Sequence, residues 1–195
     1  KDREVFNRVL IFTRSREVAG LVHQFLLNRV VREDELRVIH ANKGQNTRTN
    51  AMEAFREGNV RVMVATDVVS RGIDVSEVSH VINFDVPLMY EDYVHRIGRT
   101  GRANKVGQAI TFSTMADAYH MKKIQKMIRM DIPKVEIPEH VEITATPKNE
   151  MQDMLREIDN QKRKEDPTFQ GAFHEKKHIY RPKAKVPQKE VKSRR

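Results

Sequence analysis

Residues 62–74 have the sequence VMVATDVVSRGID, and this stretch constrains the fold more than any other. Its first four residues are apolar, and a short apolar run rich in β-branched residues favours a buried strand. A near-continuous apolar strand is typical of a sheet that is covered on both faces. Polar residues follow directly, at the carboxyl end of this strand, where open parallel sheets bind their ligands. The stretch therefore predicts a buried strand that leads into a ligand-binding loop.

Five apolar segments of this kind alternate with helical patterns along the chain. One helix is expected at Arg16–Leu27 and another at Asn46–Glu57, closed by Gly58. Alternating strands and helices predict an α/β fold with an open parallel sheet and helices on both faces. The expected strands are Arg8–Phe12, Leu36–His40, Val60–Ala65, His80–Phe84 and Gln108–Phe112.

The apolar positions of the first helix predict how it packs. Val18, Leu21, Val22, Phe25 and Leu26 share one broad face, which we expect to lie against the sheet.

Further helices are predicted after the sheet. Thr114 can cap a helix that runs to about Met130, and Pro133 and Pro138 then favour extended chain. A last helical pattern covers Glu150–Lys164. The expected organisation is a domain at residues 1–147, a helical extension at 148–165 and a tail at 166–195.

The composition limits the chemistry of the 195-residue chain. With 38% hydrophobic residues it can bury one core, and without cysteine it has neither disulfides nor thiolate metal ligands. No apolar run approaches the roughly 20 residues that span a bilayer, and the first residues, KDRE, lack the apolar core of a signal peptide. We expect a cytoplasmic protein without a membrane partner.

Basic charge is concentrated in the tail. Residues 166–195 hold nine Lys or Arg and three Asp or Glu, so nine minus three gives +6 of the total charge of +9. This composition, with scattered prolines and no apolar periodicity, predicts a disordered arm that contacts a polyanion such as nucleic acid. A solubilising role or a localisation signal fits the same composition.

The segment His95–Arg102, HRIGRTGR, holds three arginines and two glycines in eight positions. Arg99 and Arg102 are three residues apart and can direct two guanidinium groups at one place, where they would suit phosphate oxygens. The alternative is a surface cluster that pairs with carboxylates. A metal-binding role for His95 is disfavoured, because no second ligand stands at a useful spacing.

The loop after the strand at 62–65 offers groups for a sugar-phosphate chain. Thr66 and the amides around Arg71 and Gly72 could hold its phosphates, and Asp74 could accept a hydrogen bond from a ribose hydroxyl. The alternative is a local turn and a helix cap. Asp67 and Asp74 are disfavoured as a paired acid and base, because nothing nearby indicates a raised pKa.

Together these segments closely resemble the motifs of DEAD-box RNA helicases. Ala65–Asp74 is similar to motif V, Tyr93–Arg102 to motif VI and Leu10–Ser15 to motif IV of that family. The stretches His40–Phe55 and Val81–Pro87 fit the family pattern as well. The resemblance extends over roughly residues 5 to 130 and implies the C-terminal RecA-like domain of such a helicase. One departure is Ala41, where the family commonly has glycine.

The resemblance also implies roles for single residues. Arg99 and Arg102 would be arginine fingers that reach ATP, with Asp74 on its ribose, and His95 would belong to the catalytic set. His95 and Asp67 would couple the nucleotide site to the RNA site. The RNA contacts implied are those of Thr13, Gln45, Arg48, Thr66, Arg71 and Gly72.

The sequence contains neither a G-x-x-x-x-G-K-[ST] loop nor an Asp-Glu-Ala-Asp box. We therefore expect ATP with Mg²⁺ to be bound mainly by an N-terminal RecA-like domain of the same polypeptide. This chain alone would be inactive, and the full protein would be a monomeric ATP-dependent RNA helicase. The alternatives are a noncatalytic RNA-binding or scaffold module and a DNA helicase or translocase of the same superfamily.

Overall fold

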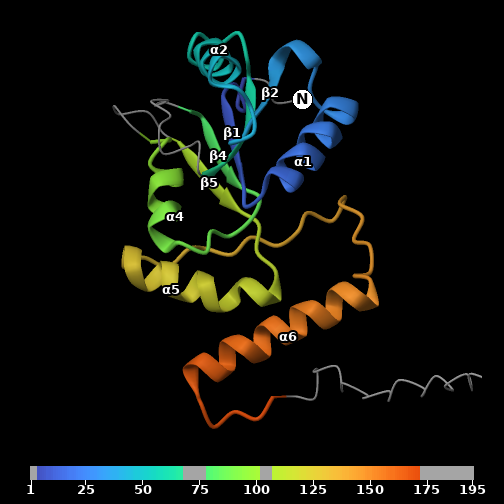
Figure 1. Cartoon of the computed structure of the whole chain (residues 1–195), viewed down its shortest axis with the longest axis vertical. Coiled ribbons are helices and arrows are strands. Elements are labelled where there is room, and N and C mark those ends of the chain that lie inside the picture. The colour runs from blue at the N-terminus through green and yellow to red at the C-terminus, as the bar shows by residue number, and fades with distance from the viewer. Residues whose placement is uncertain (1–3, 68–77, 102–106, 172–195) are drawn as a thin grey trace, which may run out of the picture. The chain divides into compact units, whose positions relative to one another are not determined.

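The computed structural model of the chain describes residues 4–67, 78–101 and 107–171. Five parallel strands form one sheet in the order β2-β3-β1-β4-β5 (Figure 1). All five predicted strands are present with ends that differ by one or two residues, so the predicted open parallel sheet is confirmed. The strands are β1 (Val9–Thr13), β2 (Leu36–Ile39), β3 (Val62–Thr66), β4 (His80–Asn83) and β5 (Gln108–Thr111).

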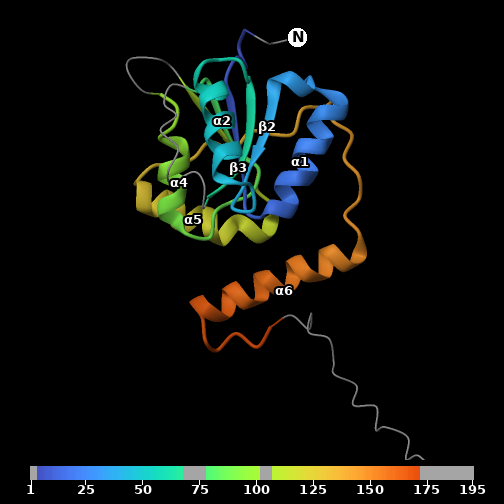
Figure 2. The same ribbon diagram turned by 45° about the horizontal axis from the view of Figure 1, so that its top comes forward.

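Helices cover both faces of this sheet. Figures 1 and 2 show α1 on one side and α2 and α4 on the other. Short 3₁₀ turns precede β2, at Glu33–Glu35, and α5, at Met115–Asp117. The helices of this part of the chain are α1 (Arg16–Arg29), α2 (Gln45–Arg56), α4 (Tyr90–Ile97) and α5 (Ala118–Ile128).

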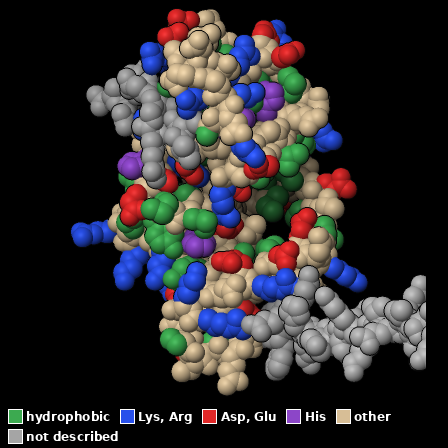
Figure 3. Space-filling model, viewed as in Figure 1, with side chains coloured by type: hydrophobic (Ala, Val, Ile, Leu, Met, Phe, Trp, Pro, Cys, Tyr) green, Lys and Arg blue, Asp and Glu red, His purple; other side chains and the backbone are tan. Residues whose placement is uncertain are grey.

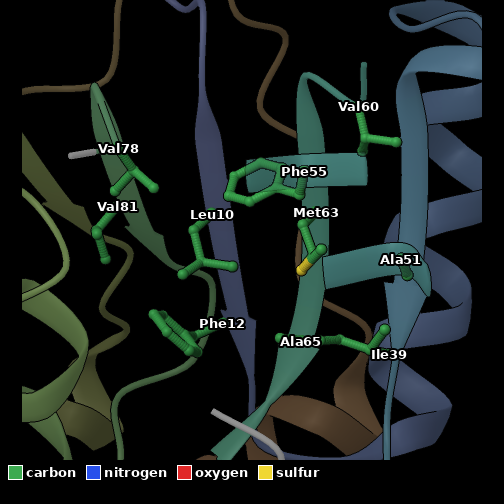
Figure 4. Packing of buried hydrophobic residues seen from close by; sticks show 10 residues of the cluster. All are labelled: Leu10, Phe12, Ile39, Ala51, Phe55, Val60, Met63, Ala65, Val78 and Val81. Atoms are coloured by element: carbon green, nitrogen blue, oxygen red, sulfur yellow. The ribbon is translucent and has the colours of Figure 1, made fainter. Parts of the chain in front are cut away.

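The central strand β1 divides the core into two layers. Leu10 and Phe12 are fully buried on the α2 side, where they pack with Phe55 of α2 (Figure 4). Val9 and Ile11 point to the opposite side, where α1 contributes Ala19 and Val22. Because side chains alternate along a strand, an unbroken apolar strand supplies both layers.

Three side-chain or backbone signals mark helix boundaries, and two of them, Gly58 and Thr114, were predicted from the sequence. The Ser15 side chain caps α1 by accepting a hydrogen bond from the Val18 amide at 3.2 Å. Gly58 follows α2 with a φ of 84°, a left-handed conformation that glycine adopts without steric cost. Thr114 and Asp117 form a capping box at the turn that begins α5.

The packing of α1 differs from the sequence prediction. Ala19 and Val22 are buried, but Leu21 is 67% exposed and Phe25 is 54% exposed. The sheet therefore covers fewer apolar residues of α1 than the five that the sequence pattern predicted. The edge strand β5 also differs from a fully covered strand, because Gln108 and Ala109 are exposed.

The chain divides into two compact units, one ending at Ala145 and the other beginning at Thr146. Pro133 and Pro138 lie in a segment without regular structure, as expected. The second unit contains α6 (Lys148–Glu165), in the region where the sequence predicted a helix at Glu150–Lys164. None of the helices in the described ranges is long and apolar enough to cross a membrane.

Candidate functional site

Polar residues stand at the carboxyl ends of the three central strands. Thr13 ends β1 and lies opposite Thr66 of β3, while Phe12 lies opposite Asn83 at the end of β4. Asp67 follows β3 directly. The parallel register therefore gathers the ends of three predicted motifs at one edge of the sheet.

The most constrained group at this edge is the side chain of Arg96, from the last turn of α4. It is 1% exposed, and its Nε donates to Oδ1 of Asp67 at 2.6 Å. Its Nη2 donates to Oδ2 of the same carboxylate at 2.7 Å. The two hydrogen bonds form a bidentate pair, the strongest arrangement available to these groups.

The remaining donors of Arg96 reach the end of β4. Nη1 donates to the Asn83 Oδ1 at 3.2 Å and to the main-chain oxygen of Asp85 at 2.7 Å. The guanidinium carbon lies 5.3 Å from the centroid of the Phe12 ring. One side chain of α4 thus contacts the ends of three neighbouring strands, which fixes the helix to this edge.

The loops after β1 and β4 are tied to each other at the same edge. The Arg14 amide donates to the Asp85 carboxylate at 2.9 Å, and the Arg14 Nη2 donates to the Val86 carbonyl at 3.0 Å. These two hydrogen bonds fix the position of Arg14 and connect the loop after β1 to the loop after β4.

Thr13 and Thr66, expected at the RNA site, are both buried, with exposures of 0% and 5%. The Thr13 hydroxyl donates to the Ser15 carbonyl at 3.2 Å, inside the turn that leads to α1. Their burial favours a role in shaping the loops that follow them.

Gln45 and Arg48 lie together on the first turns of α2. Their side chains are hydrogen-bonded, with Arg48 Nη2 donating to the Gln45 Oε1. The Arg48 Nε is buried and has no partner within the described residues. A buried N–H without a partner is costly, so the described residues do not fully satisfy the Arg48 guanidinium in this position.

His40 precedes the loop that leads to α2. Burial lowers the pKa of His40 below its ordinary value of 6.5, and the nearby charges of Lys43 and Arg16 lower it further. Its Nδ1 is buried and forms no hydrogen bond within the described part of the chain. His40 is therefore a neutral ring beside two cations at neutral pH.

Arg99 stands just beyond the end of α4, and its main chain is tied to the segment before β4. The Val78 amide donates to the Arg99 carbonyl at 3.3 Å. The Thr100 hydroxyl donates to the Val78 carbonyl at 2.5 Å, so the two segments form a short parallel bridge. Val78, the first described residue before β4, therefore lies beside Arg99 and Thr100.

His95 lies on the exposed side of α4, with 59% of its side chain exposed. Its Nδ1 is 3.8 Å from the carboxylate of Asp92, which is itself buried. The sequence resemblance named His95 and Asp67 as coupling residues. In the structure, Asp67 contacts Arg96, the residue after His95. Of the other expected site residues, Arg71, Gly72, Asp74 and Arg102 lie outside the described residues.

Sequence reasoning missed the role of Arg96, although it belongs to the arginine-rich segment. The position of Arg96 on the helix could have indicated that its side chain is buried. Arg96 follows Asp92 and Tyr93 by four and three residues, and both are buried on the same side of α4. An arginine on the buried face of a helix needs a carboxylate partner, and Asp67 supplies it.

A parallel sheet with strand order 2-3-1-4-5, whose fourth strand is followed by a helix that leads into an arginine-rich segment, defines a class of RecA-like domains. Comparisons with known proteins place the chain within this class. The pattern of the helicase conserved C-terminal domain matches residues 2–104. The chain belongs to this family, and specifically to the C-terminal domains of DEAD-box helicases.

Two relatives illustrate the similarity. The DEAD-box ATP-dependent RNA helicase RhpA of Helicobacter pylori is 42% identical over 137 residues, which cover 70% of this chain and 27% of RhpA. The ATP-dependent RNA helicase DBP3 of Gibberella zeae is 46% identical over 123 residues, covering 63% of this chain and 21% of DBP3. The chain therefore spans about a quarter of the length of these relatives.

A solved structure matches over most of its own length. The E. coli DEAD-box protein SrmB, in a complex with the regulator of ribonuclease activity A, has a TM-score of 0.61 and 32% identity. The match covers 76% of this chain and 93% of the SrmB chain. It confirms the RecA-like fold that the sequence resemblance implied.

Proposed function

We propose that this chain is the C-terminal half of an ATP-dependent RNA helicase, in which it supplies arginine fingers and part of the RNA-binding surface. The relatives named above are RNA helicases, and the chain corresponds to about a quarter of each. The observation that carries the proposal is the Arg96–Asp67 pair. This pair connects α4, which precedes Arg99, to the end of β3, where Thr66 lies.

The nucleotide site would be shared between two domains. Arg99 is partly exposed, and its main chain is bonded to Val78, close in sequence to Asp74. In the proposal, Arg99 donates to phosphate oxygens, and Asp74 accepts a hydrogen bond from the ribose. In the proposal, Arg102 is the second finger, and an N-terminal RecA-like domain binds most of the ATP with its Mg²⁺. Bound ATP would supply the phosphoanhydride bond whose cleavage drives the cycle.

The RNA surface would follow the carboxyl edge of the sheet. Gln45 and Arg48 are adjacent on α2, and a guanidinium beside a side-chain amide suits the phosphate oxygens of a nucleic acid. Thr13 and Thr66 would act mainly through the main chain of the loops that they shape, and Arg71 and Gly72 would extend the surface. Contacts to phosphates and sugars imply recognition that ignores base identity.

Coupling between the two sites would run through Asp67. The carboxylate of Asp67 holds Arg96, so a shift of the loop after β3 is transmitted to α4 and to Arg99. His95, exposed next to Arg96, is free to face the other domain. This gives the nucleotide and RNA sites a shared rigid element.

The proposed pairing with an N-terminal RecA-like domain also implies the organisation of the whole protein. The whole protein would be a monomeric cytoplasmic enzyme whose two RecA-like domains close on ATP and RNA together. The proposed division of this chain is a helicase domain at residues 1–147, a helical extension at 148–165 and a basic tail at 166–195.

The test is ATP hydrolysis by this chain joined to its native preceding domain, compared with the chain alone. We expect hydrolysis by the joined protein in the presence of RNA, weak stimulation by DNA of the same sequence, and none by the chain alone. RNA binding without hydrolysis would favour the scaffold alternative. Equal stimulation by DNA would favour a translocase that acts on either nucleic acid.

A further inference from the structure

The exposed side of α5 carries cations without acidic neighbours on the helix. Lys122 and Lys126 are one helical turn apart and both exposed, and Arg129, also exposed, directly follows the helix. We call these three residues the α5 strip. Ile124, on the opposite side of the helix, is fully buried, so the strip faces away from the domain. Figure 3 shows Lys and Arg side chains projecting from the surface over α5.

The charge pattern of α5 differs from that of the longer helix α6. The helix α5 contains three Lys and no Asp or Glu. By contrast, α6 has five Lys or Arg and five Asp or Glu, so its charges cancel. A solvated helix commonly intersperses both signs, because opposite charges three or four residues apart stabilise it. The sequence of α5 does not follow this pattern of a solvated face.

No described carboxylate neutralises the α5 strip. Among residues 4–67, 78–101 and 107–171, its three cations form no ion pair. Asp131, the next carboxylate along the chain, accepts a hydrogen bond from the Gln125 side chain at 3.5 Å. The cations of the strip are therefore available to an anionic ligand.

The helix dipole explains only part of this arrangement. Cations stabilise the last turn of a helix, where Lys126 lies, and the effect ends within that turn. Lys122 and Lys123 lie before the last turn. The Nζ of Lys123 is 5.2 Å from the centroid of the Tyr119 ring, which gives Lys123 a partner on the helix. Within the described part of the chain, Lys122 has neither an ion pair nor a ring contact.

The helix α5 begins at the edge of the sheet where RNA binding is proposed. The carboxylate of Asp117, the residue before α5, is 3.7 Å from the Arg14 Nη2 in the loop after β1. The same carboxylate accepts a hydrogen bond from the Thr114 amide at 2.9 Å. From this point α5 extends about 16 Å, with the strip along its outer side. An RNA strand that leaves the edge can therefore reach the strip within a few nucleotides.

We propose that the α5 strip binds phosphate groups of the RNA strand, next to those held at the carboxyl edge of the sheet. This inference rests on the proposed helicase function and extends its RNA surface from the sheet onto α5. Lys and Arg contacts to phosphates position a nucleic acid without reading its bases. Each contact also releases condensed counterions, so the strip makes RNA binding more dependent on salt.

An acidic protein is the alternative occupant. Met115 and Met130, which flank the strip in sequence, are 63% and 59% exposed and could contact such a partner. RNA is favoured because α5 is connected through Asp117 and Arg14 to the edge that carries the other proposed RNA contacts.

The first test measures binding of a fluorescent single-stranded RNA oligonucleotide at several salt concentrations, by the protein joined to its preceding domain. Lys122→Gln/Lys126→Gln is compared with the parent and with Arg29→Gln/Arg56→Gln. The control removes two exposed arginines from the last turns of α1 and α2. Loss of two phosphate contacts should reduce the slope of log affinity against log salt by about 1.4 in the lysine variant, and the control should keep the parent slope. An unchanged slope in the lysine variant would overturn the proposal, as would an equal reduction in the control.

Photo-crosslinking in the full-length protein in its own cells identifies the class of occupant. Ala118 is exposed and lies one turn before Lys122 on the same side of α5. A photo-crosslinking amino acid at Ala118 should yield RNA crosslinks, whereas the same group at Gln24, an exposed position of α1, should not. Crosslinks from Ala118 to protein alone would overturn the proposal in favour of an acidic partner, and so would their absence.

ATP hydrolysis separates this proposal from the helicase assignment. At saturating RNA, Lys122→Gln/Lys126→Gln should hydrolyse ATP at the parent rate, but it should need more RNA for half of that rate. If the parent hydrolyses ATP with RNA and the lysine variant keeps the parent salt slope, only the role of the α5 strip is refuted. A parent that does not hydrolyse ATP would refute the helicase assignment itself.

Discussion

The Arg96 guanidinium donates to both carboxylate oxygens of Asp67, at 2.6 and 2.7 Å, and so connects α4 to the end of β3. Arg96 is 1% exposed and the Asp67 side chain 21% exposed, so water screens this pair only slightly. A buried ion pair adds little net stability, but the loss of one partner leaves an uncompensated charge. The pair therefore fixes one arrangement of the arginine-rich segment.

Asp67→Asn should destabilise the domain strongly, because it leaves the Arg96 charge buried without a counter-ion. The expected decrease in the free energy of unfolding is about 3–5 kcal/mol, measured by urea denaturation. Arg32→Ala is the control, because Arg32 and Asp34 form an ion pair of 2.8 Å with exposed side chains. That change should cost about 0–1 kcal/mol. Equal losses in the two variants would contradict the structural role of the pair.

The double variant Arg96→Met/Asp67→Leu separates stability from coupling. Apolar replacement of both partners removes the buried charges, so we expect the double variant to recover part of the stability lost in Asp67→Asn. In the protein joined to its preceding domain, RNA-stimulated ATP hydrolysis should nevertheless stay low, because α4 is no longer tied to β3. Full activity in a stable double variant would argue against coupling through this pair.

Gly107→Ala and Gly20→Ala should have opposite effects on stability. An added Cβ at Gly107 would lie 1.8 Å from the Thr100 hydroxyl and 2.4 Å from the Gly101 amide nitrogen, so the segment next to Arg99 would have to move. We expect a loss of about 1–3 kcal/mol, as for other overpacked sites. Nothing lies within 4 Å of an added Cβ at Gly20 inside α1, where alanine should stabilise by about 0.5–1 kcal/mol. Urea denaturation of both variants checks this, and equal effects would be evidence against the close approach at Gly107.

Two histidines should make the domain less stable as the pH falls below about 6.5. Burial, with help from Lys43, lowers the pKa of both His23 and His40 from 6.5. As the pH falls through 6.5, the unfolded chain takes up protons that the folded chain does not, so the free energy of unfolding decreases. His23→Gln/His40→Gln should therefore flatten the pH dependence of the urea midpoint between about pH 8 and pH 5.

Glu17 acts in a different pH window and does not confound this measurement. A hydrogen bond from the Arg16 side chain is the largest cause that lowers the pKa of Glu17 from 4.5 to about 2. Its contribution to stability is present above pH 4.5 and is lost only as the pH falls toward the lower value. A midpoint that depends on pH equally in the double histidine variant and the parent would contradict the assignment to His23 and His40.

Most of the fold was predictable from the sequence, because each strand has a local apolar signal. Val62–Thr66 is buried along its whole length, and Gly58 and Thr114 mark helix boundaries as expected. Packing of α1 was not predictable in the same way. Helical periodicity places Leu21 and Phe25 near Val22, but only the sheet's position decides that Val22 is covered and the other two are not.

The candidate site was predictable as a set of segments but not as a set of contacts. Gln45 and Arg48 are three residues apart on a helix, so their contact follows from local geometry. The contact of Arg96 with Asp67 joins residues that are 29 positions apart and depends on the order of the strands. Spacing alone does not distinguish the buried Arg96 from the partly exposed Arg99, although both belong to one motif.

The most direct test of the central claim is RNA-stimulated ATP hydrolysis by the protein joined to its preceding domain, with Arg99→Ala and Arg102→Ala compared with the parent. Arg56→Ala is the matched control, since Arg56 is an exposed arginine at the end of α2. An arginine finger contributes roughly 10³ to 10⁵ in rate, so we predict that Arg99→Ala and Arg102→Ala each abolish measurable turnover and that Arg56→Ala keeps the parent rate. Parent-like hydrolysis in the Arg99→Ala and Arg102→Ala proteins would contradict the assignment of this chain as the finger-bearing half of an RNA helicase.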